Sequence, residues 1–265
     1  RRHPPPAPKV VVFGGNGFCG GAICRALLSR GASVVSVNRS GPPPAAAGPW
    51  AAGVEWVTAD VFDEDAWSGA LEGCSAAVSC IGGFAASNFD LERVCGDATI
   101  AAAEAAAAAG VGRFAFLSVH DYNLPEFALR NGYFGGKRRA EATVLRLFPA
   151  GGCVLRPGLV YGDRLVTPAK DIPLPIPEGL PLPPQASEPV SVPIGALAAP
   201  LEAALEAAGD LLAPLARVPG SDVVLAPPLA VEAVAEAAAA AALDPQVFGV
   251  LDIGAIRALG APPRP

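Results

Sequence analysis

The sequence has no methionine and few lysine, histidine, tyrosine or tryptophan residues. Its 265 residues include 3 Lys, 2 His, 3 Tyr and 3 Trp, and charged residues make up only 17%. The net charge is −6 and the 16 arginines are spread along the chain, so the basic surface of a nucleic-acid-binding protein is missing. No window offers the roughly 18 uninterrupted apolar residues that a membrane-spanning helix needs. These absences disfavour nucleic acid as a partner and predict no transmembrane segment.

The cysteines do not follow the spacing of a metal site or of a disulfide framework. No C-x-x-C pair occurs, and most of the six lie in apolar runs: Cys19, Cys24, Cys74, Cys80, Cys95 and Cys153. This pattern is typical of buried free thiols in a reducing compartment. We therefore expect no metal in this protein.

The start of the chain is also unusual. The absence of methionine and the opening Arg-Arg-His-Pro-Pro-Pro are typical of a chain from which a presequence has been removed, which favours an organelle. A chain numbered from its first ordered residue explains them equally well. We expect residues 1–8 to form a disordered or processed tail.

Hydrophobic residues make up 52% of the chain, which favours a folded protein. In the first half, short β-branched runs alternate with alanine-rich stretches. We predict strands at Val10–Phe13, Ser33–Val37, Val54–Thr58, Ala76–Cys80, Phe114–Ser118 and Cys153–Arg156. We predict helices at Phe18–Arg30, Glu64–Leu71, Leu91–Ala109 and Gly132–Leu147. This order predicts the α/β class, with a doubly wound parallel sheet of the Rossmann type in residues 9–162.

The composition changes after Gly162. Residues 168–193 contain nine prolines, which favours a loop or lid over a central strand or a helix interior. Helices are predicted at Ile194–Ala208 and Ala230–Leu243, followed by a strand at Phe248–Ile253. We expect residues 163–265 to form a small C-terminal lobe that contributes to the substrate site or closes over it.

A glycine loop joins the first predicted strand to the first predicted helix. Gly15, Gly17 and Gly20 satisfy the motif G-x-G-x-x-G. Gly14, Gly17 and Gly20 satisfy the G-x-x-G-x-x-G spacing of the short-chain reductases. Such a loop lets the backbone approach a pyrophosphate closely, and the helix N-terminus offers N–H groups to the anion. The sequence therefore predicts nucleotide binding here, the alternative being a turn that serves only helix–strand packing.

The end of the second strand distinguishes the two nicotinamide cofactors. Asn38-Arg39-Ser40 stands where an NAD-preferring protein carries an acid that bonds the ribose 2′-hydroxyl. Arg39 can bind a 2′-phosphate in a forked geometry and Ser40 can add a hydrogen bond, so NADP is favoured over NAD. Asp60, after the third strand, is either an adenine contact or a turn former.

A tyrosine and a lysine four residues apart form the second signal. On a helix Tyr133 and Lys137 share one face and can both reach a nicotinamide ribose. The ammonium would lower the pKa of the phenol, so that Tyr133 acts as general acid or base towards a carbonyl. Ser118, at the end of the fifth strand, would polarise that carbonyl. The alternative is a tyrosine that only packs and a lysine that is solvated.

The loop after Ser118 is a weaker candidate. His120 and Asp121 lie at the same edge of the predicted sheet and could line a substrate pocket. Such a pair in a loop is also common on ordinary polar surfaces.

These motifs together resemble the atypical short-chain dehydrogenase/reductase (SDR) family. The resemblance rests on Gly14–Gly20, Ser118, Tyr133-x-x-x-Lys137 and the R-P-x-x-V-Y-G segment at 156–162, which is similar to extended members. Residues 79–84, 119–125 and 131–134 are similar to a plant and algal plastid branch of plastoglobule-associated NAD(P)-binding Rossmann proteins. The likeness runs from about Lys9 to Ile253. Ser118 precedes Tyr133 by 15 residues, and the further catalytic Asn of the simplest members has only the unmatched Asn123 nearby.

The resemblance implies a chloroplast protein at the thylakoid or plastoglobule periphery, near isoprenoid or quinone metabolism, because the branch is similar to mitochondrial relatives implicated in ubiquinone biosynthesis. A mitochondrial location is the alternative. We expect the cofactor to contact Gly14, Gly15, Asn16, Gly17, Phe18, Cys19, Gly20, Asn38, Arg39, Ser40, Asp60, Val61, Cys80, Ile81, Gly82, Tyr133, Lys137, Pro157 and Gly158.

Two functions remain open at this point. The first is an NADP-dependent oxidoreductase acting on a small hydrophobic carbonyl or quinone-like compound, with Ser118, Tyr133 and Lys137 as catalytic residues. The second is a catalytically silent NADP-binding structural or assembly subunit of an organellar, membrane-associated complex, with the proline-rich loop offered to a partner.

Overall fold

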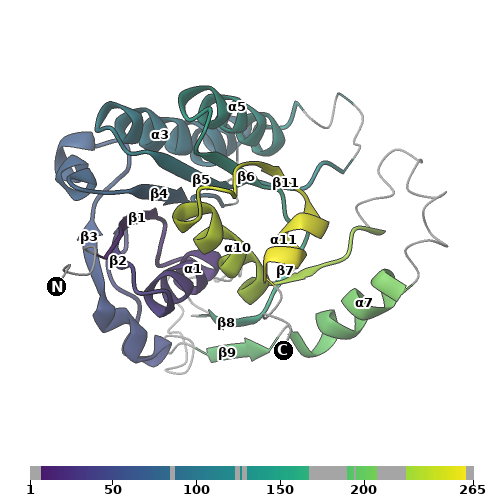
Figure 1. Cartoon of the computed structure of the whole chain (residues 1–265). Helices are drawn as coiled ribbons and strands as arrows, with labels where there is room; N and C mark the ends of the chain where they lie inside the picture. Colours follow the sequence, from purple (N-terminus) through teal and green to yellow (C-terminus); the bar gives the residue numbers. More distant parts are fainter. Residues whose placement is uncertain are drawn as a thin grey trace, which may run out of the picture.

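The computed structural model describes residues 7–83, 87–122, 126, 130–166, 190–193, 195–207 and 225–260. Seven strands form one sheet in the order β11-β6-β5-β4-β1-β2-β3 (Figure 1). All six neighbouring pairs run parallel. This is a doubly wound α/β sheet of the Rossmann type, and the predicted fold class is confirmed.

The strands of the sheet begin and end within two residues of the predicted ones. They are β1 (Lys9–Phe13), β2 (Ser33–Asn38), β3 (Val54–Thr58), β4 (Ala76–Ser79), β5 (Arg113–Leu117), β6 (Gly152–Leu155) and β11 (Gly249–Leu251). The agreement follows from their β-branched runs, because a strand buried on both faces is apolar throughout.

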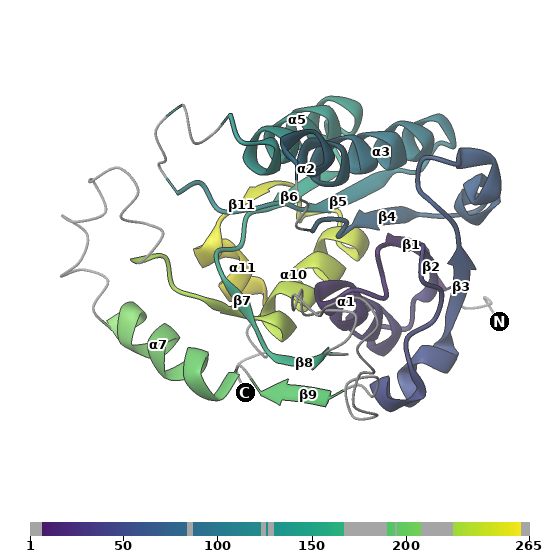
Figure 2. The ribbon, with the colours of Figure 1, turned by 180° about the vertical axis from the view of Figure 1, so that it is seen from behind.

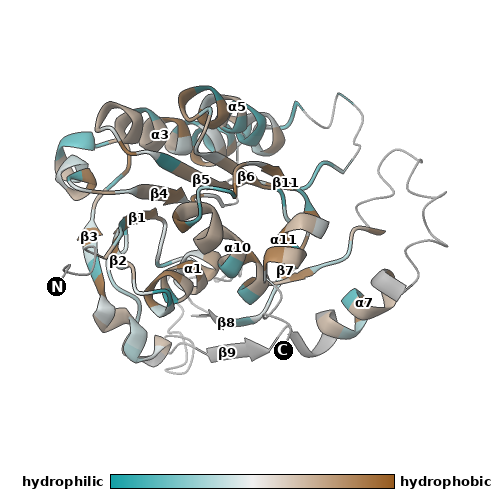
Figure 3. Ribbon diagram, in the orientation of Figure 1, coloured by the Kyte–Doolittle hydropathy of each residue, from teal (hydrophilic) through white to brown (hydrophobic). Residues whose placement is uncertain are grey.

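Helices cover both faces of the sheet (Figures 1 and 2). One face carries α1 (Phe18–Ser29), α10 (Val231–Leu243) and α11 (Ile253–Gly260), and the other carries α2 (Asn88–Glu92), α3 (Ala98–Ala108) and α5 (Gly132–Leu147). Successive residues of β1 alternate between the two cores: Val10 and Val12 pack with α1 and α10, whereas Val11 and Phe13 pack with α3 and α5. Figure 3 shows hydrophobic colouring along the central strands and hydrophilic colouring on outer parts such as α5.

The prediction of one helix over Glu64–Leu71 is wrong. Two 3₁₀ helices occur instead, η3 (Glu64–Ala66) and η4 (Ser68–Leu71), separated by Trp67 with φ −139°. The Trp67 ring meets Phe13 edge-on with 5.0 Å between centroids, and its indole N–H donates to the Val61 carbonyl at 3.1 Å. Trp67 is thus fully buried at the point where the helix is interrupted.

The helix expected over Leu91–Ala109 begins earlier and contains a π turn. Ser87 caps α2, because its hydroxyl accepts a hydrogen bond from the Asp90 N–H at 3.1 Å. The π turn η5 (Arg93–Asp97) then joins α2 to α3. Its Gly96 crosses Gly136 of α5 so closely that a Cβ on Gly96 would lie 2.7 Å from the Gly136 Cα. Gly136 thus permits backbone contact between helices, which explains a glycine in the middle of a helix.

The chain beyond Gly162 does not separate wholly from the sheet. α10 packs on α1, and β11 extends the sheet beside β6, so both belong to the same layers as residues 9–162. The sequence predicts a lobe for this region because alanine-rich helices give no indication of what they pack against. Residues 167–189 of the proline-rich stretch lie outside the described residues, as do Phe84 and Asn123.

Short elements surround the carboxyl edge of the sheet. β8 (Asp163–Val166) pairs antiparallel with β9 (Val190–Pro193), and β7 (Val160–Tyr161) pairs parallel with β10 (Leu229–Ala230). The connection from β2 to β3 contains η1 (Ala45–Ala47) and η2 (Pro49–Gly53). Helix α7 (Gly195–Ala207) is joined to the core through Glu202, which accepts hydrogen bonds from Tyr161 at 2.5 Å and Arg257 at 2.9 Å. Within the described ranges, none of the helices combines the length and hydropathy needed to cross a bilayer.

Candidate functional site

The glycine loop between β1 and α1 has the tight geometry that phosphate binding requires. Gly14 has φ +89°, which side chains rarely adopt, and the Gly17 N–H donates to the Gly14 carbonyl at 2.9 Å. A Cβ on Gly15 would lie 3.0 Å from the Cys24 Sγ, and one on Gly20 would lie 2.8 Å from the Gly15 Cα. The loop therefore folds against α1 and leaves no space for side chains at these positions.

The N-terminus of α1 is prepared for an anion. Gly17 is its N-cap, with no side-chain cap hydrogen bond and no acidic residue in the first turn. The first N–H groups of a helix lack intrahelical partners, and the helix dipole favours negative charge beside them. These observations fit a dinucleotide pyrophosphate at this loop.

The loop forms one wall of an open cavity of about 910 Å³. Most of the predicted cofactor contacts line it: Gly14, Gly15, Asn16, Gly17, Phe18, Asn38, Arg39, Ser40, Asp60, Val61, Cys80, Ile81 and Gly82. Among the described lining residues, those that sequence analysis missed include Arg25, Trp50, Phe62, Arg93 and Asp163. Cys19, Gly20, Tyr133, Lys137, Pro157 and Gly158 do not line this cavity.

The end of β2 is ordered by a set of hydrogen bonds between polar side chains. The Asn38 Oδ1 accepts from the Ser40 N–H at 3.1 Å, and the Asn16 amide donates to the Ser40 hydroxyl at 2.9 Å. Arg39 is exposed and, within the described part of the chain, has no hydrogen-bond or ion-pair partner. Asp60 lines the cavity and also accepts from the Phe62 N–H at 3.1 Å, so it forms a turn while facing the cavity.

Lys137 is buried directly behind the cavity wall. Its ammonium donates to the carbonyls of Leu117 at 2.8 Å and Ile81 at 3.2 Å, and it lies 4.7 Å from the centroid of the Phe116 ring. Ile81 is itself a lining residue. Burial lowers the pKa of Lys137 to about 8.

The pKa of the Tyr133 phenol is raised, whereas the sequence predicts a lowered pKa. Burial, rather than any nearby charge, is the main influence, and it raises the pKa of Tyr133 to about 12. The neighbouring cation that lowers this pKa is Arg138, whereas the Lys137 ammonium donates to main-chain carbonyls. The phenol is therefore protonated at neutral pH, which suits a proton donor.

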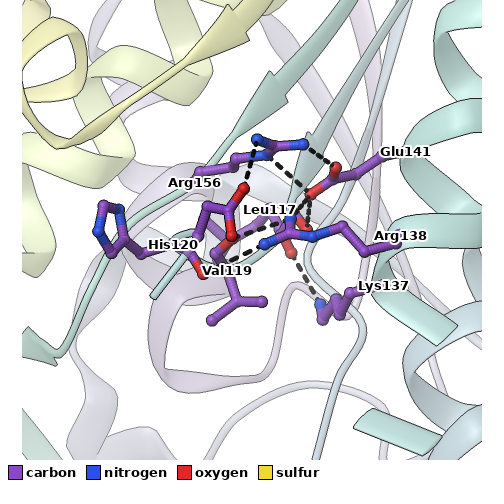
Figure 4. A network of polar contacts seen from close by, with 9 residues as sticks. Leu117, Val119, His120, Lys137, Arg138, Glu141 and Arg156 are labelled. Carbon is purple, nitrogen blue, oxygen red and sulfur yellow. Dashed lines mark hydrogen bonds and ion pairs between the residues drawn. The ribbon is translucent and has the colours of Figure 1, made fainter. Parts of the chain in front are cut away.

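A buried polar network at the ends of β5 and β6 contains Glu141, Arg138 and Arg156 (Figure 4), and Ser118 joins it through Glu141. The Ser118 side chain is not labelled in the figure. Its hydroxyl donates to Glu141 of α5, a carboxylate that is only 4% exposed. Glu141 also accepts from Arg138 and, at 2.5 Å, from the Arg156 Nη2. Because the Ser118 proton is directed at Glu141, polarisation of a substrate carbonyl by Ser118 requires this bond to be exchanged.

The network also fixes the loop after Ser118. Arg138 donates to the carbonyls of Val119 and His120, both at 3.2 Å, and the His120 N–H donates to the Pro157 carbonyl at 2.7 Å. Asp121 lies 3.8 Å from the Arg156 guanidinium and is 59% exposed. Sequence analysis missed Glu141, although it lies four residues after Lys137 and so on the same face of α5, and it missed Arg138, which lies three residues before Glu141.

The described residues contain no cluster of His, Cys, Asp or Glu side chains arranged for a metal ion. Each of the six cysteines is a free thiol. Burial raises the pKa of Cys24 and of Cys153 to about 12.

Comparison with known proteins agrees with this site. A family described as NAD(P)H-binding matches residues 14–146, which run from the glycine loop to the end of α5. A chloroplastic protein of Arabidopsis thaliana, itself named as uncharacterized, is 41% identical over 256 residues, covering 97% of this chain and 78% of its own. The MIOREX complex component 2 of Saccharomyces cerevisiae is 39% identical over 79 residues, or 28% of either chain.

Solved structures share the fold at low sequence identity. The Bordetella bronchiseptica enzyme WbmH in complex with NAD⁺ has a TM-score of 0.52 and 19% identity, over 61% of this chain and 59% of its own. The enzyme WbmG of the same organism in complex with NAD has a TM-score of 0.51 and 19% identity, over 62% and 58%. This chain thus spans less than two thirds of these solved chains.

Proposed function

The chain belongs to the NAD(P)H-binding family of Rossmann-fold proteins, and from this premise we propose that it is an NADP-dependent oxidoreductase. The glycine-loop cavity carries the proposal, since it combines a close-packed loop, an uncapped helix N-terminus and an exposed arginine at the end of β2. NADP is favoured over NAD because Arg39 stands where an acidic residue would bind the ribose 2′-hydroxyl.

The proposed substrate is a small hydrophobic carbonyl or quinone-like compound. The resemblance to the plastid branch of the SDR family supports this substrate class. The chloroplastic relative in Arabidopsis supports a chloroplast location, and the thylakoid or plastoglobule periphery is the proposed site within it.

The proposed chemistry assigns one proton step to the protein. Tyr133 would donate its phenolic proton to the oxygen of the substrate carbonyl, and the chemistry supplied by NADPH, when bound, would be hydride transfer to the carbonyl carbon. The raised pKa of Tyr133 keeps that proton in place at neutral pH. Lys137, fixed by the carbonyls of Leu117 and Ile81, is proposed to orient the cofactor ribose. Arg138, the cation that lowers the pKa of Tyr133, is proposed to supply positive charge as the tyrosine loses its proton.

Ser118 is proposed to position the substrate through the buried network. Its bond to Glu141 ties the end of β5 to the helix that carries Tyr133 and Lys137. Exchange of that bond for one to the substrate carbonyl would give Ser118 the polarising role predicted from sequence.

The test is consumption of NADPH by the purified protein with a panel of quinones and hydrophobic aldehydes or ketones. Tyr133→Phe is compared with the matched control Tyr122→Phe, which removes a second phenol whose ring is 6.4 Å from that of Phe134. We expect NADPH binding to survive in both variants and turnover to fall about 100-fold or more only in Tyr133→Phe.

Other outcomes would overturn the proposal in distinguishable ways. Binding of NADPH without turnover of any compound by the wild type would indicate the structural or assembly subunit instead. Loss of turnover in Tyr122→Phe alone would transfer the proton step to Tyr122. Absence of binding to both NADPH and NADH would overturn the cofactor assignment itself.

A further inference from the structure

The arginines of this protein are divided unevenly between paired and unpaired side chains. Those that bind carboxylates or main-chain carbonyls are Arg30, Arg113, Arg130, Arg138, Arg139, Arg156 and Arg257. Among side chains that the structure describes, Arg25, Arg39, Arg93 and Arg146 have no hydrogen-bond or ion-pair partner. The first three line the glycine-loop cavity. Among the described lining residues, three are carboxylates, Asp60, Asp90 and Asp163, but none of them forms an ion pair with these arginines, so each guanidinium remains available for an anionic ligand.

Arg25 is held in place without being neutralised. It lies on α1 about two turns beyond Gly17 and lines the cavity. The guanidinium carbon lies 5.7 Å from the centroid of the Trp50 ring, within the range of a cation–π contact.

The ring of Trp50 is itself fixed from three sides. Its indole N–H donates to the Ala47 carbonyl at 2.7 Å, and its ring meets Trp56 at 6.0 Å between centroids. On the third side it packs on Gly21, where a Cβ would lie 3.5 Å from the ring. An arginine that is stacked on a fixed ring is already ordered, so its guanidinium loses little side-chain entropy when it binds an anion.

The part of the β2–β3 connection that follows Ser40 contributes no charge to the cavity, and the acidic lining residues Asp60, Asp90 and Asp163 come from other segments. The connection at residues 41–53, which contributes Pro43, Pro44 and Trp50 to the cavity, contains no Asp, Glu, Lys or Arg. A phosphate monoester carries a charge between −1.5 and about −2 at neutral pH, so one guanidinium leaves part of it uncompensated. Arg93 comes from the π turn and stacks on Phe62, with 4.5 Å between its guanidinium carbon and the ring centroid.

We propose that Arg25 and Arg39 together bind the 2′-phosphate of NADP, and that Arg25 is a second determinant of cofactor specificity. This inference rests on the proposed function, since it concerns the same nucleotide cavity. The sequence does not reveal it, because Arg25 lies outside the segment that follows β2.

The test uses two ligands that differ only in the phosphate, 2′,5′-ADP and 5′-AMP, titrated calorimetrically into the full chain. The variants are Arg25→Met, Arg25→Lys and Arg39→Met, with Arg146→Met as the matched control because Arg146 is unpaired and outside the cavity. We expect Arg25→Met to weaken 2′,5′-ADP binding about tenfold or more, as loss of a charge-assisted contact does, with 5′-AMP binding changed by less than about twofold. Arg25→Lys is expected to restore part of the loss.

Each contrary result has a separate meaning. If wild type prefers 2′,5′-ADP but Arg25→Met keeps the same preference, the role of Arg25 is refuted while the NADP assignment stands. If Arg25→Met weakens both ligands equally, Arg25 acts through the packing of Trp50 and the inference is again refuted. If wild type binds 5′-AMP as tightly as 2′,5′-ADP, the preference for NADP fails, whereas the oxidoreductase proposal is judged by turnover alone.

Discussion

Replacement of Glu141 is expected to destabilise the protein more than replacement of any exposed glutamate. Its carboxylate is 4% exposed and accepts hydrogen bonds from Ser118, Arg138 and Arg156. Breaking a buried ion pair costs about 3–5 kcal/mol, because the remaining charge loses its partner. Arg138 and Arg156 are about one quarter exposed and keep other contacts, so the lower end of that range applies to Glu141→Ala.

The isosteric variant separates charge from shape. Glu141→Gln keeps the volume and one acceptor oxygen, so we expect a loss of about 1.5–3 kcal/mol, the contribution of hydrogen bonds to a charged group. Glu104→Gln is the matched control, since Glu104 is exposed on α3, and its effect should stay within about 0.5 kcal/mol.

The assay is urea unfolding followed by circular dichroism, with the free energy of unfolding obtained from the midpoint and slope. A double-mutant cycle of Ser118→Ala with Glu141→Gln should give a coupling of at least about 0.5 kcal/mol, as residues in one hydrogen-bond network do. A Glu141→Ala variant whose free energy of unfolding is within about 1 kcal/mol of wild type would refute the reasoning. Such a result would mean that the three hydrogen bonds of the buried carboxylate contribute little to stability.

Two further predictions concern α5. The pKa of Lys137 is lowered to about 8 from its ordinary value of 10.5, so between these values the unfolded chain binds a proton that the folded chain has released. The contribution of Lys137 to stability therefore rises with pH in that window. Measured by urea unfolding, the free energy of unfolding of wild type minus that of Lys137→Met should increase by more than about 1 kcal/mol between pH 8 and 10. A difference that stays unchanged over this range would contradict the prediction. Gly136→Ala should lower the free energy of unfolding by about 1–3 kcal/mol, because its Cβ would lie 3.0 Å from the Glu92 carbonyl oxygen. Gly69→Ala, with open space around its Cβ, should have little effect, and equal melting temperatures for the two variants would contradict the close helix crossing.

The parts of the molecule that could be predicted from sequence are those set by local signals. The β-branched run of β1 and the glycines at 14, 15, 17 and 20 define a strand, a turn and a helix start within a dozen residues. The position of Arg39 could be predicted for the same reason, because this residue directly follows the β-branched run of β2.

The parts that could not be predicted depend on contacts between distant residues. Glu141 meets Ser118 and Arg156 across separations of 23 and 15 residues, and no pattern near Glu141 indicates a buried carboxylate. The predicted helix is interrupted at Trp67, whose ring is buried against Phe13, 54 residues away in the sequence. Arg25 occupies an ordinary helical position, and only the fold of residues 41–53 beside α1 brings it to the cavity.

The central claim is that the glycine-loop cavity binds NADP, and a calorimetric titration of wild-type protein with NADPH and with NADH tests it most directly. The account predicts saturable binding of both, with NADPH bound about tenfold or more tightly because its 2′-phosphate meets Arg39 and Arg25. Tighter binding of NADH, or no heat of binding with either nucleotide, would contradict it.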